Sequence, residues 1–207
     1  MAVAGRRNGM EDEEEGEEGI LFDEQLEFLG DVSDSDTPPH LRDLATAAER
    51  GNVEDLRLAL DNFIGSIDEP VEDGDTALHL TCLYGHLPCV QLLLERGANL
   101  EVKDEDGALP LHDACAGGYT DIVQLLLNSG NSPECVKRML ESVDLDGDTP
   151  LHHAARGEHM EAIRLLLASG ASPNRENVYG KTPRELAEPD TEARRILEEA
   201  ASAMAGH

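Results

Sequence analysis

Apolar and polar residues recur in the same order several times after residue 40. Three gap-free copies of one motif occupy residues 73–82 (DGDTALHLTC), 106–115 (DGALPLHDAC) and 146–155 (DGDTPLHHAA). Each copy is followed by a run of three leucines and then by a glycine. The leading glycines are 33, 40 and 33 residues apart, and they are Gly74, Gly107, Gly147 and Gly180. This spacing predicts a repeat array with a seven-residue insertion between Gly130 and Gly147.

Each copy predicts two short helices. Thr-Pro favours a helix start, because Thr accepts hydrogen bonds from the first turn and Pro fits the first helical position. Gly85 and Gly118 suit left-handed helix ends. Apolar residues such as Val90, Leu93 and Leu94 then recur at the spacing of a second helix. One such pair cannot bury both of its faces, so the pattern predicts an all-α repeat solenoid.

The 33-residue unit and the motif T-P-L-H-x-A resemble ankyrin repeats over residues 41–200. The resemblance implies a stack in which each unit has a β-turn finger, an inner helix and an outer helix. We expect a partial repeat at 41–72, full repeats at 73–105, 106–145 and 146–178, a cap at 179–200 and a tail at 201–207. The third unit, 106–145, carries the insertion.

Several positions depart from the family pattern. Leu109 replaces Thr, so the third unit should lack the Thr–His hydrogen bond of the family. Gly157 and Glu158 shift the usual helix-ending glycine by one residue, which predicts a distorted turn. The insertion has apolar residues at 135, 136, 139 and 140, and this helical spacing predicts an extra helical turn beside the third unit's outer helix.

The first 40 residues differ from the repeats. They hold 13 acidic and two basic residues, and residues 11–18 contain no apolar side chain, so we expect a disordered acidic segment. Residues 20–29 mix apolar and acidic side chains, and at helical spacing the apolar ones would share a face. Ser33 has acids at +1 and +3, which makes it a candidate phosphorylation site, although a solvated linker explains the same residues.

Charge restricts the function classes. With 44 acidic and 16 basic residues the net charge is -28, which argues against binding to nucleic-acid phosphates or to anionic membranes. A charged partner is therefore expected to be basic. No apolar run approaches a membrane span or a secretory signal. Four cysteines without a CxxC pair indicate free thiols and a cytoplasmic or nuclear location.

Recurring histidines are the main candidates for metal chemistry. His79, His112 and His152 appear once per unit, and imidazole is a common metal ligand. The resemblance instead implies that they link successive repeats, and units about 10 Å apart cannot share zinc bonds of about 2 Å. Nucleophile elbows, Walker loops and dinucleotide fingerprints are missing from the sequence. We therefore expect no catalytic, cofactor-binding or metal-binding residues.

The resemblance implies that partners contact finger tips and exposed inner-helix positions. Asp also favours turns for conformational reasons alone, so part of the acidity has a structural explanation. The expected partner-binding residues are Asp73, Asp75, Leu83, Tyr84, Glu105, Asp106, Asp146, Asp148, Arg156 and Tyr179. These residues indicate a monomeric, non-enzymatic adaptor that binds a basic protein. The alternative is an escort or chaperone for a basic nucleic-acid-binding client, such as a ribosomal protein or a histone.

Overall fold

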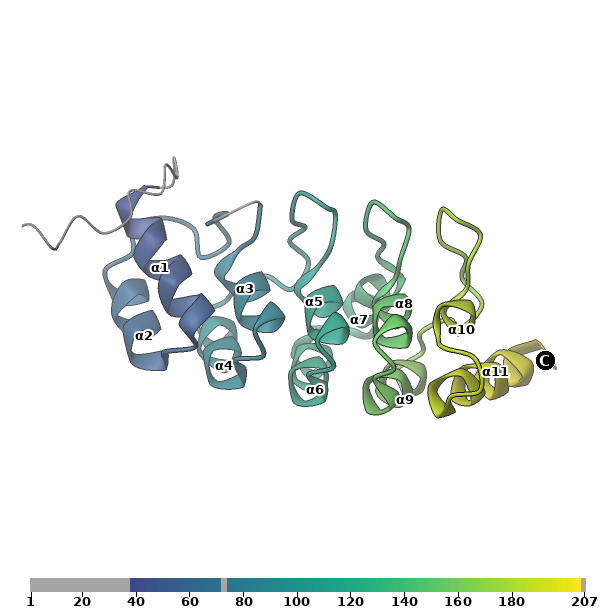
Figure 1. The fold of residues 1–207 in the computed structure, drawn as a ribbon. Helices are drawn as coiled ribbons and strands as arrows, with labels where there is room; N and C mark the ends of the chain where they lie inside the picture. The colour runs from purple at the N-terminus through teal and green to yellow at the C-terminus, as the bar shows by residue number, and fades with distance from the viewer. Residues whose placement is uncertain (1–37, 72–73, 206–207) are drawn as a thin grey trace, which may run out of the picture. The chain divides into compact units, whose positions relative to one another are not determined.

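The computed structural model of the chain describes residues 38–71 and 74–205 (Figure 1). The expectations for the acidic segment up to residue 37, including Ser33 and residues 20–29, lie outside the described residues. In the described part the helices are α1 (Pro39–Arg50), α2 (Val53–Asp61), α3 (Ala77–Leu83), α4 (Leu87–Glu95), α5 (Pro110–Ala116), α6 (Thr120–Ser129), α7 (Pro133–Glu141), α8 (Pro150–Arg156), α9 (Met160–Ala168), α10 (Pro183–Leu186) and α11 (Glu192–Ala205).

The helices alternate between two layers, as the repeat pattern predicts. The inner helices α1, α3, α5, α8 and α10 pack against one another in sequence order, and α2, α4, α6, α9 and α11 do the same in the outer layer (Figure 1). Leucines from both layers meet in one continuous core, in which Leu78, Leu111 and Leu151 are fully buried. Small residues on the inner helices, such as Ala114 and Cys115, let neighbouring helices approach closely. The expected all-α repeat stack is confirmed.

The inner helices α3, α8 and α10 begin with a threonine whose hydroxyl contacts a side chain of the first turn. Thr76 and Thr149 contact the Nδ1 atoms of His79 and His152, at 3.0 and 2.8 Å. Leu109 lacks the hydroxyl, as expected, but its backbone N–H still donates to Nδ1 of His112 at 2.9 Å. The same backbone bond is present at Thr76 and Thr149, so the third unit keeps this half of the cap and loses only the hydroxyl contact.

Tight turns connect the units and project from the inner layer as the expected fingers (Figure 1). Gly74 and Gly147 have positive φ angles of 78° and 74°, and an added Cβ would lie 2.5 and 2.8 Å from the backbone N of the next finger. Only glycine can adopt this positive φ and also leave room for the backbone of the next finger. The fingers are joined by hydrogen bonds from Leu145 N–H to the Asp106 carbonyl and from Val178 N–H to the Asp146 carbonyl, at 2.8 and 2.9 Å.

The expected distortion after α8 is wrong. Glu158 takes the left-handed conformation itself, with φ of 56°. The turn keeps the bond from His159 N–H to the Ala154 carbonyl at 3.0 Å, which corresponds to His86 N–H and the Thr81 carbonyl at 2.8 Å. The Glu158 carboxylate also accepts a hydrogen bond from the Glu188 N–H at 2.6 Å.

The insertion forms more than the predicted helical turn. It is the nine-residue helix α7, which Ser132 caps by accepting from Cys135 N–H. Cys135, Met139 and Leu140 are buried in the common core. Arg138 pairs with Glu101, 37 residues earlier in the chain, through bonds of 2.7 and 2.8 Å. The helix therefore connects the loop after α4 to the third unit, instead of only lying beside α6.

Both ends of the stack reach beyond the expected limits of residues 41 and 200. Helix α1 begins at Pro39, because proline at the first helical position loses no intrahelical hydrogen bond. Helix α11 continues to Ala205 and buries Ala201. Among residues 38–71 and 74–205, no helix combines the length and apolar character needed to cross a bilayer.

Candidate functional site

The end of α3 carries the most exposed apolar side chains on the inner helices. Leu83 is 42% exposed and Tyr84 is 49% exposed. The Tyr84 ring stacks on His86, with ring centroids 6.2 Å apart and an interplanar angle of 27°. His86 is held in turn by a 2.7 Å contact between its Nε2 and the Glu49 carbonyl. The Tyr84 ring is therefore exposed to solvent and supported from behind.

The finger tips carry exposed carboxylates. Glu105, Asp106 and Asp146 are exposed, whereas Asp75 is half-buried at the base of its finger. Tyr179 is 67% exposed, and its hydroxyl donates to Oδ1 of Asp146 at 2.9 Å. This hydrogen bond to a carboxylate, together with its charge, raises the pKa of Tyr179. Asp73 lies outside the described residues.

Asp148 is not a surface residue, and the expectation that it lies at a finger tip is wrong. It is 0% exposed, and its Oδ1 accepts a 2.7 Å hydrogen bond from Asn177. Its Oδ2 accepts from the Arg156 guanidinium. Arg156 is exposed at the end of α8, as the sequence indicates, but it is engaged by the protein's own carboxylate.

A second internal pair lies at the junction of α5 and α8. Nε2 of His153 lies 2.7 Å from Oδ2 of Asp144. Burial opposes the ionisation of Asp144, but hydrogen bonds from His153 and from the Asp148 N–H lower the pKa of this carboxyl below its usual value. His153 therefore stabilises the charged form of Asp144.

His112 contacts the same region edge-on. Its ring centroid lies 5.6 Å from that of His153, and burial with the charge of His153 lowers the pKa of His112 to about 4. The Nε2 atoms of His79 and His152 reach carbonyls of the next finger at 3.4 and 3.1 Å. Nε2 of His112 meets no acceptor at hydrogen-bond geometry, although the nearby Ser142 carbonyl favours its protonation. The link to the next finger that His79 and His152 make is therefore missing at His112.

Sequence reasoning missed a carboxylate cluster at the junction of α3 and α5. We define the junction cluster as Asp75, Asp104 and Asp113. Burial, together with the charges of Asp75 and Asp104, raises the pKa of Asp113 to about 8. Oδ2 of Asp113 is fully buried and has no hydrogen-bond partner. One sequence feature indicates this cluster: residue 113 is an acid inside an inner helix, whereas the neighbouring copies carry Leu80 and His153 at the same position.

Among residues 38–71 and 74–205, two groups bring potential metal ligands within 4.8 Å of one another. One is Asp75, His79 and Asp104, and the other is Asp144, Asp148 and His153. In the second group Arg156 and Asn177 already occupy both oxygens of Asp148. In the first group both ring nitrogens of His79 contact protein groups, namely Thr76 and the Ala108 carbonyl. His79 therefore acts as a structural link between its own helix start and the next finger.

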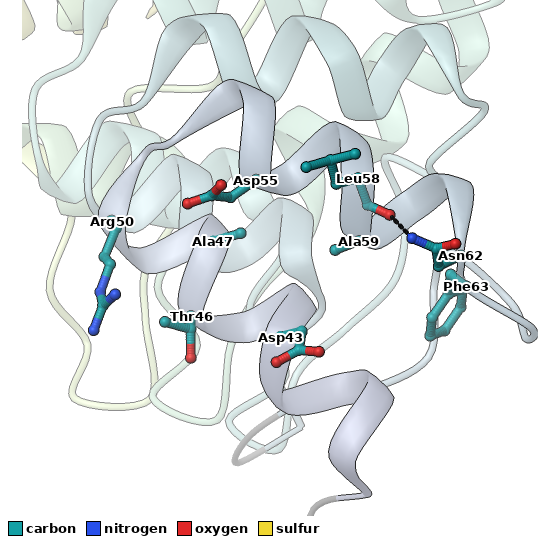
Figure 2. A pocket seen from close by; sticks show the side chains of 9 residues that line it. All are labelled: Asp43, Thr46, Ala47, Arg50, Asp55, Leu58, Ala59, Asn62 and Phe63. Atoms are coloured by element: carbon teal, nitrogen blue, oxygen red, sulfur yellow. Dashed lines mark hydrogen bonds between the residues drawn. The ribbon is translucent and has the colours of Figure 1, made fainter. Parts of the chain in front are cut away.

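A groove at the start of the stack lies between α1 and α2 (Figure 2). It has a volume of about 370 Å³ and combines apolar residues, such as Leu58 and Phe63, with Asp43, Arg50 and Asp55. Leu58 is 60% exposed at this face. The terminal unit therefore retains some of the apolar surface that a further repeat would bury in an array.

The paired helices, the fingers and the histidine links agree with one known family. A family model described as ankyrin repeats in three copies matches residues 44–134 and 128–197. The matched residues include the inner helices α3, α5, α8 and α10, part of α1, and the fingers described above. Repeats of this family are protein-interaction modules. The match covers most of the sequence, and the chain belongs to the ankyrin repeat family.

Proposed function

We propose that the protein is a non-enzymatic adaptor that binds a basic segment of a protein partner along its fingers and inner helices. The observation that carries this proposal is the exposure of Glu105, Asp106 and Asp146 on adjacent fingers. Their backbones are joined from finger to finger, so their spacing is maintained by the fold. Leu83 and Tyr84 add an apolar surface on α3.

Acids on neighbouring fingers produce a negative field that attracts basic ligands before contact. Such a field contributes more to association rate and specificity than to affinity. Apolar anchors contribute affinity when they are buried at an interface, and tyrosine is common among such anchors. The combination of acidic fingers with Leu83 and Tyr84 is suited to a basic segment that also carries apolar side chains.

Charge reversal of the three finger acids to lysine tests the proposal. Proteins captured from a cell lysate by the full chain and by the Glu105→Lys/Asp106→Lys/Asp146→Lys variant would be quantified by mass spectrometry. We expect the main basic partner to be lost while helicity is unchanged, because exposed substitutions usually change stability by less than about 0.5 kcal/mol. A matched control reverses three exposed acids of the outer helices, Glu95, Asp121 and Glu199. Equal capture by both variants would contradict the proposal.

The net charge of -28 favours a second candidate function, an escort for a basic nucleic-acid-binding client. An acidic protein can occupy basic surfaces that later bind nucleic-acid phosphates. Repeating the capture at 50 and 300 mM salt separates the two functions. Many basic clients with steep salt dependence would support the escort, and one partner with weak salt dependence would support the adaptor.

A further inference from the structure

Neighbouring repeats provide different hydrogen-bond partners for the carboxylates at their junctions. Between α5 and α8, Asp144 is paired with His153 at 2.7 Å. Between α8 and α10, Asp148 accepts hydrogen bonds from Asn177 and Arg156. At both junctions the protein supplies the donors itself.

The repeat register identifies the corresponding positions between α3 and α5. Counted from the leading glycines, Asp104 corresponds to Asp144 and Asn177, and Asp113 corresponds to His153. Leu83 stands where the fourth repeat has Arg156. Each position that provides a donor or a cation elsewhere is thus acidic or apolar at this junction.

Because this junction lacks those donors, the Asp113 side chain is left with an unsatisfied oxygen. Its Oδ2 is fully buried and accepts no hydrogen bond. The carboxylates of Asp75 and Asp104 are close enough to oppose its ionisation. An unpaired buried carboxylate oxygen is unfavourable, and donors supplied by a ligand would remove this cost.

We propose that the junction cluster of Asp75, Asp104 and Asp113 binds an arginine side chain of the protein partner. The assignment rests on the proposed function, because it presupposes a protein ligand, and it names the chemistry of one contact. A guanidinium offers five N–H donors in a planar fork and suits several carboxylates better than the point charge of lysine does. The cluster already brings carboxylate oxygens of Asp75 and Asp104 within 4.8 Å of each other.

The fourth repeat shows how this family scaffold accommodates a guanidinium. Arg156 at the end of α8 donates to Asp148, whose counterpart in the second repeat is Asp75. The position at the end of α3 that corresponds to Arg156 holds Leu83, which is 42% exposed. The next residue, Tyr84, is exposed as well. An incoming arginine can pack its apolar stem on the leucine and its cationic group near an aromatic ring. The partner's arginine would thus replace a side chain that the second repeat lacks.

A peptide titration tests this assignment directly. The full chain, labelled with ¹³C and ¹⁵N, would be titrated with acetyl-Leu-Arg-Leu-amide at constant ionic strength while the aspartate carboxyl resonances are recorded. We expect saturable shifts centred on Asp75, Asp104 and Asp113. The same peptide with citrulline, which is isosteric and neutral, should bind at least tenfold more weakly, and the peptide with lysine should bind severalfold more weakly.

Two variants act on the cluster from different directions. Asp113→Asn should weaken the arginine peptide at least fivefold, whereas Asp106→Asn, which removes one exposed finger charge, should change it less than twofold. Leu83→Arg should fill the cluster from within and weaken the peptide at least tenfold. Leu58→Arg, at another exposed leucine, is its matched control and should have little effect. Circular dichroism would verify that each variant is folded.

Several outcomes would overturn the proposal. Equal weakening by Asp113→Asn and Asp106→Asn, or shifts spread evenly over the exposed acids without saturation, would reduce the effect to general electrostatics. Saturation of the same resonances by calcium or zinc chloride, with none by the peptide, would assign the cluster to a metal ion. If the peptide fails while partner capture still depends on the finger acids, only this inference falls. If capture is independent of those acids while the peptide binds the cluster, only the finger-based function falls.

Discussion

Arg156 donates a hydrogen bond to Asp148, a carboxylate with no surface exposed to solvent. The guanidinium side chain itself is half exposed. Removing one partner of a buried ion pair leaves the other without compensation. The resulting loss of folding free energy is larger than the net stabilisation that the intact pair provides. The pair is therefore important for stability even though its cationic half lies at the surface.

We expect Arg156→Ala to destabilise the fold by about 2 kcal/mol, because the buried Asp148 side chain loses one of its hydrogen-bond donors. Urea denaturation followed by circular dichroism would measure this change. In an Asp148→Asn background, where the buried charge is absent, Arg156→Ala should cost less than about 0.5 kcal/mol. Equal costs in both backgrounds would show that the two residues are not energetically coupled.

Asp113 should make stability fall as the pH rises. Its pKa in the folded chain, about 8, exceeds its ordinary value of 3.8, so between these values the folded state retains a proton that the unfolded state has released. The contribution of Asp113 to the free energy of unfolding is fully present below pH 3.8 and declines as the pH rises toward about 8. The charged groups that act on this site are Asp75 and Asp104. Burial, and after it the charge of Asp113, raises the pKa values of the Cys82 and Cys115 thiols.

Asp113→Asn should therefore stabilise the fold relative to the natural chain by an amount that grows from pH 5 to pH 9 and reaches about 2 kcal/mol. Denaturant unfolding at pH 5, 7 and 9 measures the difference. Asp43→Asn, at an exposed position of α1, is the control and should show little pH dependence. A constant difference between Asp113→Asn and the natural chain across this range would contradict the raised pKa.

Glu158 combines an unfavourable backbone conformation with a favourable contact. Its φ of 56° costs a residue with a Cβ about 1 kcal/mol, and its bond to the Glu188 N–H offsets this cost. Glu158→Ala should destabilise by about 1 kcal/mol, because it loses the bond and keeps the strain. Glu158→Gly loses the bond but relieves the strain, so it should be nearly neutral. Thermal unfolding of both variants measures this, and a larger loss for Gly than for Ala would refute the account.

The repeat architecture could be predicted because its determinants are periodic. The spacing of Gly74, Gly107, Gly147 and Gly180, and the leucine that precedes each motif histidine at 78, 111 and 151, mark the turns and the core directly. The apolar residues of the insertion alone predict a shorter helix than the one that forms. Ser132, which caps α7, and Pro133, at its first helical position, extend the helix toward the N-terminus by two residues.

The surface was predicted less well than the fold, because sequence position alone does not separate an exposed finger acid from a buried one. Asp146 and Asp148 are two residues apart, yet only Asp146 is exposed. The difference follows from the turn, which directs Asp148 toward Asn177 and Arg156. The junction cluster was missed for a related reason: Asp104 and Asp113 come together only when the finger folds back over its own inner helix.

The backbone bonds between adjacent fingers also affect the entropy of binding. The bonds from Leu145 N–H and Val178 N–H to the preceding fingers hold neighbouring turns together before any partner arrives. A ligand that spans these turns meets a preorganised surface, so the cost of ordering falls almost entirely on the ligand. A flexible segment that becomes ordered on binding would therefore bind with a lower affinity for the same contact area. Rigidifying the segment in its bound conformation would then raise affinity without adding a contact.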